Sequence, residues 1–288
     1  MGRLKLVIDM TDRKDLELMD YMEPECVLCD KPVGFKQKKQ MIPQQRISQK
    51  LDELMGRKEY QQAENLLKYW LEEARVSFDD QGVFMLYNEM MGYYRKMADK
   101  DNAYKAVDNA LSMLDELDYR DSVSGATCYT NAATVYTAFG EPEKSVELFE
   151  KARTIYENNR EHNEYKLASL YNNMATALVA LKRYSEADEL YHKALEVDSQ
   201  IENSQLEMAM TYLNILDALI SEKGVENIDD EAAILLAQAK DCLDDERLER
   251  DSYYSFVCDK CVGIYRYFGW FRYAGELEER ITEIDERA

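Results

Sequence analysis

The stretch ASLYNNMATALVALKRYSEADELYHKALEV (residues 168–197) decides the fold of this chain. Its first half repeats apolar or small residues at the i, i+3, i+4 and i+7 positions of a helix face, namely Tyr171, Met174, Ala175 and Leu178. The segment Lys182 to Tyr184 interrupts this pattern as a turn. A second face then follows, made of Ala187, Leu190, Tyr191, Ala194 and Leu195. Because small residues alternate with large ones, the two backbones can approach closely, and the stretch predicts a helical hairpin.

The same pattern recurs about every 42 residues along the chain. The most regular feature is a small residue at equivalent positions, found at Ala63, Ala103, Ser145, Ala187, Ala232 and Ala274. An internal period of this size indicates stacked supersecondary units rather than a conventional globular core. We therefore predict an all-α chain with about six helical hairpins between residues 44 and 288, ending in a capping helix. Residues 1–43 are predicted to form a partly irregular N-terminal extension, since two prolines and a glycine interrupt the stretch 23–34.

Composition restricts the classes of partner. Glycine (11) and proline (4) are scarce, which favours helix throughout. Acidic residues outnumber basic ones 57 to 36, for a net charge of −21. Such a field repels nucleic-acid phosphates and anionic membranes, so we expect no nucleic acid and no membrane as partner, but a basic or neutral protein segment. No apolar run reaches the roughly 18–20 residues of a membrane span.

Six cysteines in a chain of this length suggest reduced thiols, and we predict a cytoplasmic location. Two of the cysteine pairs have the Cys-x-x-Cys spacing of zinc sites, Cys26 with Cys29 and Cys258 with Cys261. The second pair falls on repeat positions of the hydrophobic core, where a free cysteine acts as a small buried residue. The first pair lies in a proline-bounded segment, and a metal or thiol role for it remains an alternative.

The alternation of large and small residues resembles the tetratricopeptide repeat (TPR). The order that carries the resemblance is Tyr171, Met174, Ala175, Leu178, Ala187, Tyr191 and Ala194, matched one period earlier by Tyr129, Ala132, Ala133, Tyr136, Ser145, Phe149 and Ala152. The period exceeds the usual 34 residues by about eight, and in this the chain resembles the arrays of kinesin light chains and many bacterial regulators. The resemblance implies a right-handed superhelical solenoid, with a concave groove lined by the first helix of each hairpin. It also implies a non-catalytic scaffold that binds a protein or peptide segment there.

Asparagines on the first helices are the sharpest candidates for ligand contact. Asn131 and Asn173 each follow an aligned tyrosine by two residues, Asn214 does so after a one-residue slip, and Asn88 lies one position off register. An amide both donates and accepts, so it can hold a peptide bond whatever the ligand's side chain. The resemblance implies this role for Asn131 and Asn173, whereas the simpler alternative is that such amides bond neighbouring helices. The predicted groove consists of Asn131, Asn173, Asn214, Asn88, Thr134, Asn172, Thr176 and Arg95.

Signals of catalysis are sparse. The chain has two histidines, His162 and His192, and no glycine-rich phosphate loop or metalloprotease spacing. We therefore expect no catalytic residue, no cofactor and no bound metal. Chaperone-type arrays hold an acidic chain terminus with Lys and Arg on later first helices. The corresponding positions here carry Ser169, Asn173, Thr211 and Ile215 instead, which argues against recognition of an acidic chain terminus. Two alternatives stay open, a peptide-sensing regulator and a metal- or thiol-dependent protein using Cys26 and Cys29. The oligomeric state is not predicted.

Overall fold

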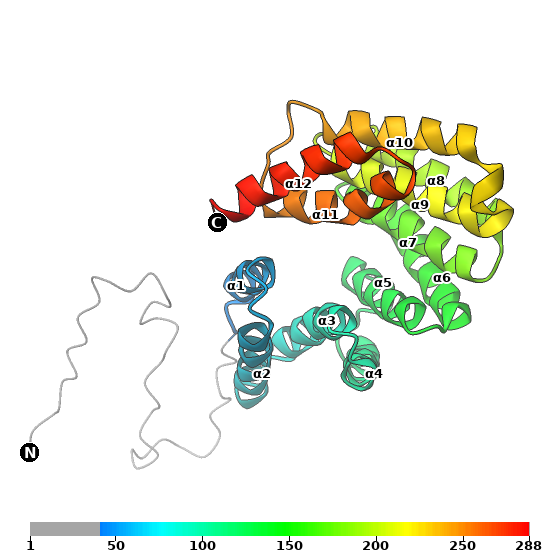
Figure 1. The fold of residues 1–288 in the computed structure, drawn as a ribbon. Coiled ribbons are helices and arrows are strands. Elements are labelled where there is room, and N and C mark those ends of the chain that lie inside the picture. The colour runs from blue at the N-terminus through cyan, green and yellow to red at the C-terminus, as the bar shows by residue number, and fades with distance from the viewer. Residues whose placement is uncertain (1–40, 288) are drawn as a thin grey trace, which may run out of the picture.

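The computed structural model describes residues 41–287, which form twelve α-helices arranged as six antiparallel hairpins (Figure 1). In chain order the hairpins are α1 (Gln44–Gly56) with α2 (Tyr60–Val76), α3 (Asp80–Lys96) with α4 (Lys100–Glu116), α5 (Val123–Ala138) with α6 (Pro142–Asn158), α7 (Glu164–Ala180) with α8 (Tyr184–Asp198), α9 (Gln205–Lys223) with α10 (Asp229–Leu243), and α11 (Ser252–Tyr267) with α12 (Phe271–Asp285). A short 3₁₀ turn, η2 (Val225–Asn227), precedes α10. The predicted all-α array of six hairpins is confirmed.

Small residues sit where the helices of a hairpin cross. In α7 and α8 the side chains of Ala175, Ala187 and Ala194 are fully buried, and Tyr191 fills the space beside them. Ser145 takes the equivalent position in α6 and is also fully buried, with its hydroxyl donating to the Glu141 carbonyl. These contacts form a continuous core along the array, as a stack of repeats requires.

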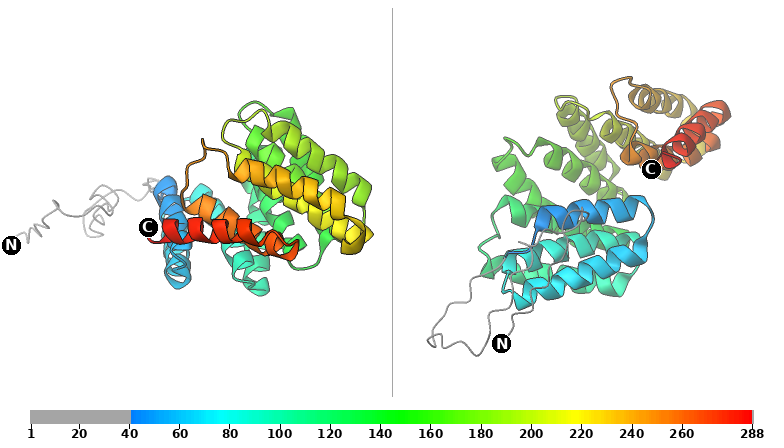
Figure 2. Two further views of the ribbon diagram at one scale, coloured as in Figure 1. Left: turned by 45° about the horizontal axis from the view of Figure 1, so that its top comes forward. Right: turned by 90° about the vertical axis from the view of Figure 1, so that its left-hand side faces the viewer.

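The array curves with its odd-numbered helices on the inside. Each odd-numbered helix packs against the next odd-numbered one, from α1 and α3 through to α9 and α11. Among the described helices, no two even-numbered ones pack comparably; they contact odd-numbered neighbours instead. The first helices therefore lie closer together than the second helices, and the curved arrangement is visible in Figures 1 and 2. The exposed sides of the odd-numbered helices line the concave surface.

The last hairpin docks through a few specific contacts. Residues 244–251 link α10 to α11 without helix. The hydroxyls of Tyr254 and Tyr265 donate to the carbonyls of Leu243 and Leu236 at 3.1 and 2.9 Å, and Arg280 pairs with Asp244 at 2.7 Å. The predicted capping segment belongs to α12, the second helix of this sixth hairpin.

The Cys-x-x-Cys pair within the array belongs to the hydrophobic core. Cys258 and Cys261 on α11 are fully buried and free, as the repeat pattern predicted. Burial raises the pKa of their thiols to about 11 and about 12, respectively. The described residues hold no cluster of potential metal ligands, and Cys26 and Cys29 lie outside them. Between residues 41 and 287, no helix is both long and apolar enough to cross a bilayer.

Candidate binding groove

A hollow of about 330 Å³ opens across the concave faces of α1, α3 and α5. Four side-chain amides line it together with an apolar floor provided by Phe84 and Met85. The complete lining is Gln44, Gln81, Phe84, Met85, Asn88, Glu89, Tyr119, Ser124, Thr127 and Asn131. Amides above an aromatic and aliphatic floor suit a peptide, because its main chain needs donors and acceptors while its side chains need apolar surface.

The two predicted asparagines in this hollow contact each other. Asn131 on α5 donates an N–H to the side-chain oxygen of Asn88 on α3 at 3.1 Å, and Asn88 donates to the Phe84 carbonyl at 2.9 Å. The two positions are 43 residues apart, one more than the repeat period. Among the described residues, the side-chain oxygen of Asn131 and the second N–H of its amide have no hydrogen-bond partner. That half of the amide is available to a ligand.

A second amide pair repeats the arrangement farther along the array. Asn214 on α9 donates to the side-chain oxygen of Asn172 on α7 at 3.1 Å. The aligned Asn173 instead donates to the hydroxyl of Ser169 within its own helix, at 3.3 Å. Both amide pairs thus join neighbouring first helices, as expected if these amides bond helix to helix. Each pair still has donors and acceptors that this one bond does not use.

Two of the remaining predicted residues, Thr134 and Thr176, lie beside these pairs, and Arg95 lies on the same helix as Asn88. The hydroxyl of Thr134 donates to the Asn131 carbonyl, and that of Thr176 lies within hydrogen-bonding distance of the Asn172 carbonyl and the Tyr191 hydroxyl. Arg95, in the last turn of α3, is exposed. Desolvation nevertheless lowers the pKa of its guanidinium, which fits a side chain flanked by protein in a concave surface.

Acidic and glutamine residues of the hollow were missed by the sequence reasoning. Glu89 on α3 accepts a hydrogen bond from the Ser48 hydroxyl of α1 at 2.9 Å. Burial raises the pKa of Glu89, and the Asp52 carboxylate raises it further against the effect of that bond. The 42-residue period could have identified Glu89 as a groove residue, since it occupies the same repeat position as Asn131 and Asn173. Gln44 and Gln81 had no such signal.

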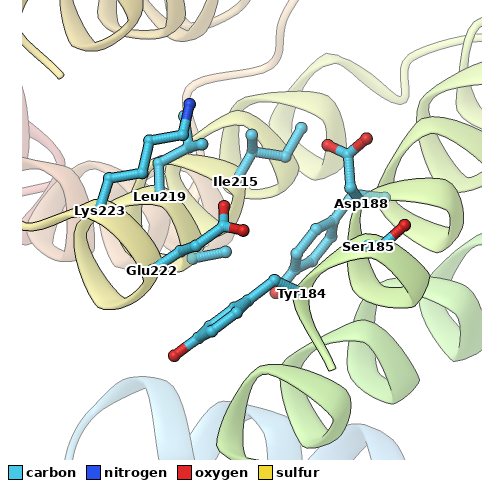
Figure 3. Close-up of a pocket in the computed structure, with 9 residues that line it drawn as sticks. Tyr184, Ser185, Asp188, Ile215, Leu219, Glu222 and Lys223 are labelled. Atoms are coloured by element: carbon cyan, nitrogen blue, oxygen red, sulfur yellow. The ribbon is translucent and has the colours of Figure 1, made fainter. Parts of the chain in front are cut away.

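A second hollow of about 280 Å³ lies between α8 and α9 (Figure 3). Ile215 and Leu219 supply aliphatic surface, while the carboxylates of Asp188 and Glu222 stand at its sides. The Tyr184 hydroxyl closes one edge by donating to the Ser221 carbonyl at 3.1 Å. Aliphatic surface between two carboxylates can accept the stem and charged end of a basic side chain.

Comparison with known families decides what the central hairpins are. A model of the tetratricopeptide repeat family matches residues 126–159 and 167–197, which cover most of α5 to α8. The two central hairpins are tetratricopeptide repeats. No curated protein sequence matches the chain significantly.

Two solved structures resemble this chain at low sequence identity. BtubC (BKLC) from P. vanneervenii superimposes with a TM-score of 0.55 and 18% sequence identity, over 69% of this chain and 78% of that one. A putative kinesin light chain of Podosopora anserina with nearly identical TPR-like repeats gives a TM-score of 0.46 and 16% identity, over 70% and 94% of the two chains. The first of these likenesses establishes a shared solenoid fold.

Proposed function

We propose that this chain is a non-catalytic scaffold that binds an extended protein or peptide segment in the concave groove of its TPR array. The observation that carries the proposal is the amide-lined hollow across α1, α3 and α5. Stacked repeats generally use such concave surfaces to bind other proteins. The predicted residues Asn88, Asn131, Asn172, Asn173 and Asn214 all belong to first helices of successive hairpins.

The proposed chemistry is recognition of the ligand's main chain. In each interhelical amide pair, one hydrogen bond fixes the orientation of both side chains, at 3.1 Å in either pair. A fixed amide loses less conformational entropy when a ligand binds than a freely rotating one does. The groove would therefore select an extended backbone, and the apolar floor at Phe84 and Met85 would take its side chains.

The charge of the molecule supports a basic or neutral segment as ligand. The net charge of −21 favours the approach of cationic chains, and the hollow between α8 and α9 offers Asp188 and Glu222 to a basic side chain. We place this interaction in the cytoplasm, in keeping with the free thiols at Cys128, Cys242, Cys258 and Cys261. A metal or thiol role for Cys26 and Cys29 stays a separate proposal, which metal analysis of the purified chain would address.

Peptides selected from a random phage library on the full chain provide a test that needs no known partner. Their dissociation constants are measured by fluorescence polarisation for the wild type and for the Asn131→Ala/Asn173→Ala double variant. We expect affinity to fall about tenfold or more, because each lost hydrogen bond is worth roughly 1 kcal/mol.

The matched control is Asn109→Ala, which removes an exposed amide from α4, a second helix outside the groove. It should leave the dissociation constant unchanged. Unaltered affinity in the double variant, with circular dichroism showing an intact array, would overturn the groove proposal.

A further inference from the structure

Lys96 and Lys260, from distant parts of the chain, meet at the ring of Phe256, and Lys58 is near enough to Lys96 to repel its charge. Lys58 lies in the turn between α1 and α2, Lys96 ends α3, and Lys260 belongs to α11. The ring of Phe256 on α11 joins two of them, with the Lys96 Nζ 5.8 Å and the Lys260 Nζ 5.5 Å from its centroid. The Lys96 Nζ also lies 5.6 Å from the centroid of the Tyr60 ring. We call these three lysines and Phe256 the lysine cluster.

The cluster lacks the counter-charges that surround most basic groups in this protein. Neither Lys58, Lys96 nor Lys260 forms an ion pair with any residue between 41 and 287. Desolvation lowers the pKa of Lys96, and repulsion from Lys260 and Lys58 lowers it further. Cations held near one another without an anion repel each other, which costs free energy.

The aromatic rings hold the cations in place without neutralising them. A ring face attracts an ammonium group electrostatically, which compensates for part of the repulsion. The charge of each lysine remains available, since a ring provides no anionic partner. An anion arriving between the three side chains would remove their mutual repulsion and gain three attractions at once.

We propose that the lysine cluster binds an anionic group, a side-chain carboxylate or a phosphate, carried by the peptide that occupies the groove. This inference rests on the proposed function, because Lys96 belongs to the same helix as Asn88. Eight residues separate the two, which is about 12 Å along a helix axis and equals about four residues of extended peptide. A ligand that is basic or neutral overall would thus carry one acidic or phosphorylated residue about four positions from the segment held at Asn88.

The anion site can be tested on the full chain without any peptide. Reductive methylation with ¹³C-formaldehyde labels the lysines and keeps their charge, and single Lys→Arg variants assign the signals. Two probes are titrated at low ionic strength, N-acetylglutamate methylamide and N-acetylphosphoserine methylamide. We expect the signals of Lys58, Lys96 and Lys260 to shift together and to saturate, and the tighter probe identifies the anion as a carboxylate or a phosphate. The control is Lys151, which lies 5.7 Å from the Tyr129 ring with no second lysine bridging to it, and which should show no saturable shift.

Two variants distinguish a failure of the anion site from a failure of the groove. Lys96→Gln should abolish the saturable shifts of Lys58 and Lys260, with an unchanged circular dichroism spectrum. The Asn131→Ala/Asn173→Ala variant should leave the saturable shifts of the lysine signals unchanged. Loss of groove binding can therefore be told apart from loss of the anion site. The inference is wrong if neither probe gives saturable shifts, or if Lys151 responds as strongly as the cluster.

Discussion

At the scale of single residues, Asp198 is a carboxyl group buried in the core of the array. It is the last residue of α8, its side chain is 3% exposed, and no described residue donates a hydrogen bond to its carboxyl group. Burial raises its pKa to about 7, and the Glu207 carboxylate on α9 contributes to the rise. Glu207 itself accepts a hydrogen bond from the Tyr253 hydroxyl of α11 at 3.1 Å. A carboxyl group in this setting is held protonated by its surroundings, and its ionisation destabilises the fold.

The stability contributed by Asp198 should therefore depend on pH. Because its pKa rises on folding from an ordinary 3.8 to about 7, the folded chain retains a proton that the unfolded chain loses. This contribution is complete below about pH 4 and is lost as the pH rises towards 7. Asp198→Asn should make the protein more stable than the wild type at pH 8, by about 2–4 kcal/mol, with a smaller difference at pH 5. Urea denaturation at both pH values measures this.

Asp217→Asn is the matched control, since it removes an exposed carboxylate from α9. Its effect on stability should be small at either pH. Equal urea midpoints for wild type and Asp198→Asn across the pH range would contradict the assignment of Asp198.

Buried thiols give a second prediction at this scale. Burial raises the pKa of Cys128 to about 12, as it does for the thiols of α11, so almost no thiolate exists at neutral pH. In a Cys26→Ser/Cys29→Ser/Cys242→Ser background, the three fully buried cysteines, Cys128, Cys258 and Cys261, should react with Ellman's reagent at pH 8 only after denaturant is added. Rapid stoichiometric reaction of the native protein would show that these positions are not core.

At the scale of the elements, the hairpin turns share one backbone conformation with different residues. The turns of the first, second and fourth hairpins place Lys58, Ala98 and Lys182 at positive φ, whereas Gly140 and Gly269 occupy that position in the third and sixth. In the second hairpin the Ala98 N–H donates to the Arg95 carbonyl and so ends α3. A residue with a Cβ is strained in this conformation and glycine is not, so the turns store unequal amounts of strain.

Exchanging the residue types in two turns should change stability in opposite directions. Ala98→Gly should stabilise the protein by about 1 kcal/mol, because it removes the strain at a φ of 54°. Gly140→Ala should destabilise it by a similar amount through backbone strain alone, since an added Cβ would meet no atom within 4 Å. Urea midpoints measure both effects. A lower midpoint for Ala98→Gly together with a higher one for Gly140→Ala would mean that flexibility of the unfolded chain outweighs turn strain.

At the scale of the whole molecule, stability is expected to be unevenly distributed along the array. In a stack of repeats each hairpin is stabilised mainly by its neighbours, and the end hairpins have one neighbour fewer. The sixth hairpin also follows a non-helical linker, and α11 packs on α9. The central hairpins α5–α6 and α7–α8 make the most extensive contacts within themselves and with each other.

Hydrogen exchange should show this distribution directly. We expect amides of α11 and α12 to exchange through local opening, faster than those of α5 to α8. Leu277→Ala, a fully buried site on α12, should accelerate exchange in the last hairpin alone, whereas Phe149→Ala on α6 should accelerate it throughout the centre. Uniform acceleration by Leu277→Ala would indicate that the array unfolds as one cooperative unit.

The sequence by itself determined the hairpins, their number and most of the core. The spacing of Tyr171, Ala175, Ala187 and Ala194 fixes two helix faces, because residues three and four apart share a face in any α-helix. The same period placed Cys258 in the core and marked the helices that line the groove. These features follow from near neighbours in the chain, so pattern alone was sufficient.

Only the tertiary structure decided which groups meet across the array. Asn131 contacts Asn88, 43 residues away, and Asn172 rather than Asn173 contacts Asn214, 42 residues away. The meeting of Lys96 with the α11 ring of Phe256 depends on the curvature accumulated over the intervening hairpins. That curvature arises from the summed sizes of side chains at every interface, and no local pattern in the sequence encodes the sum.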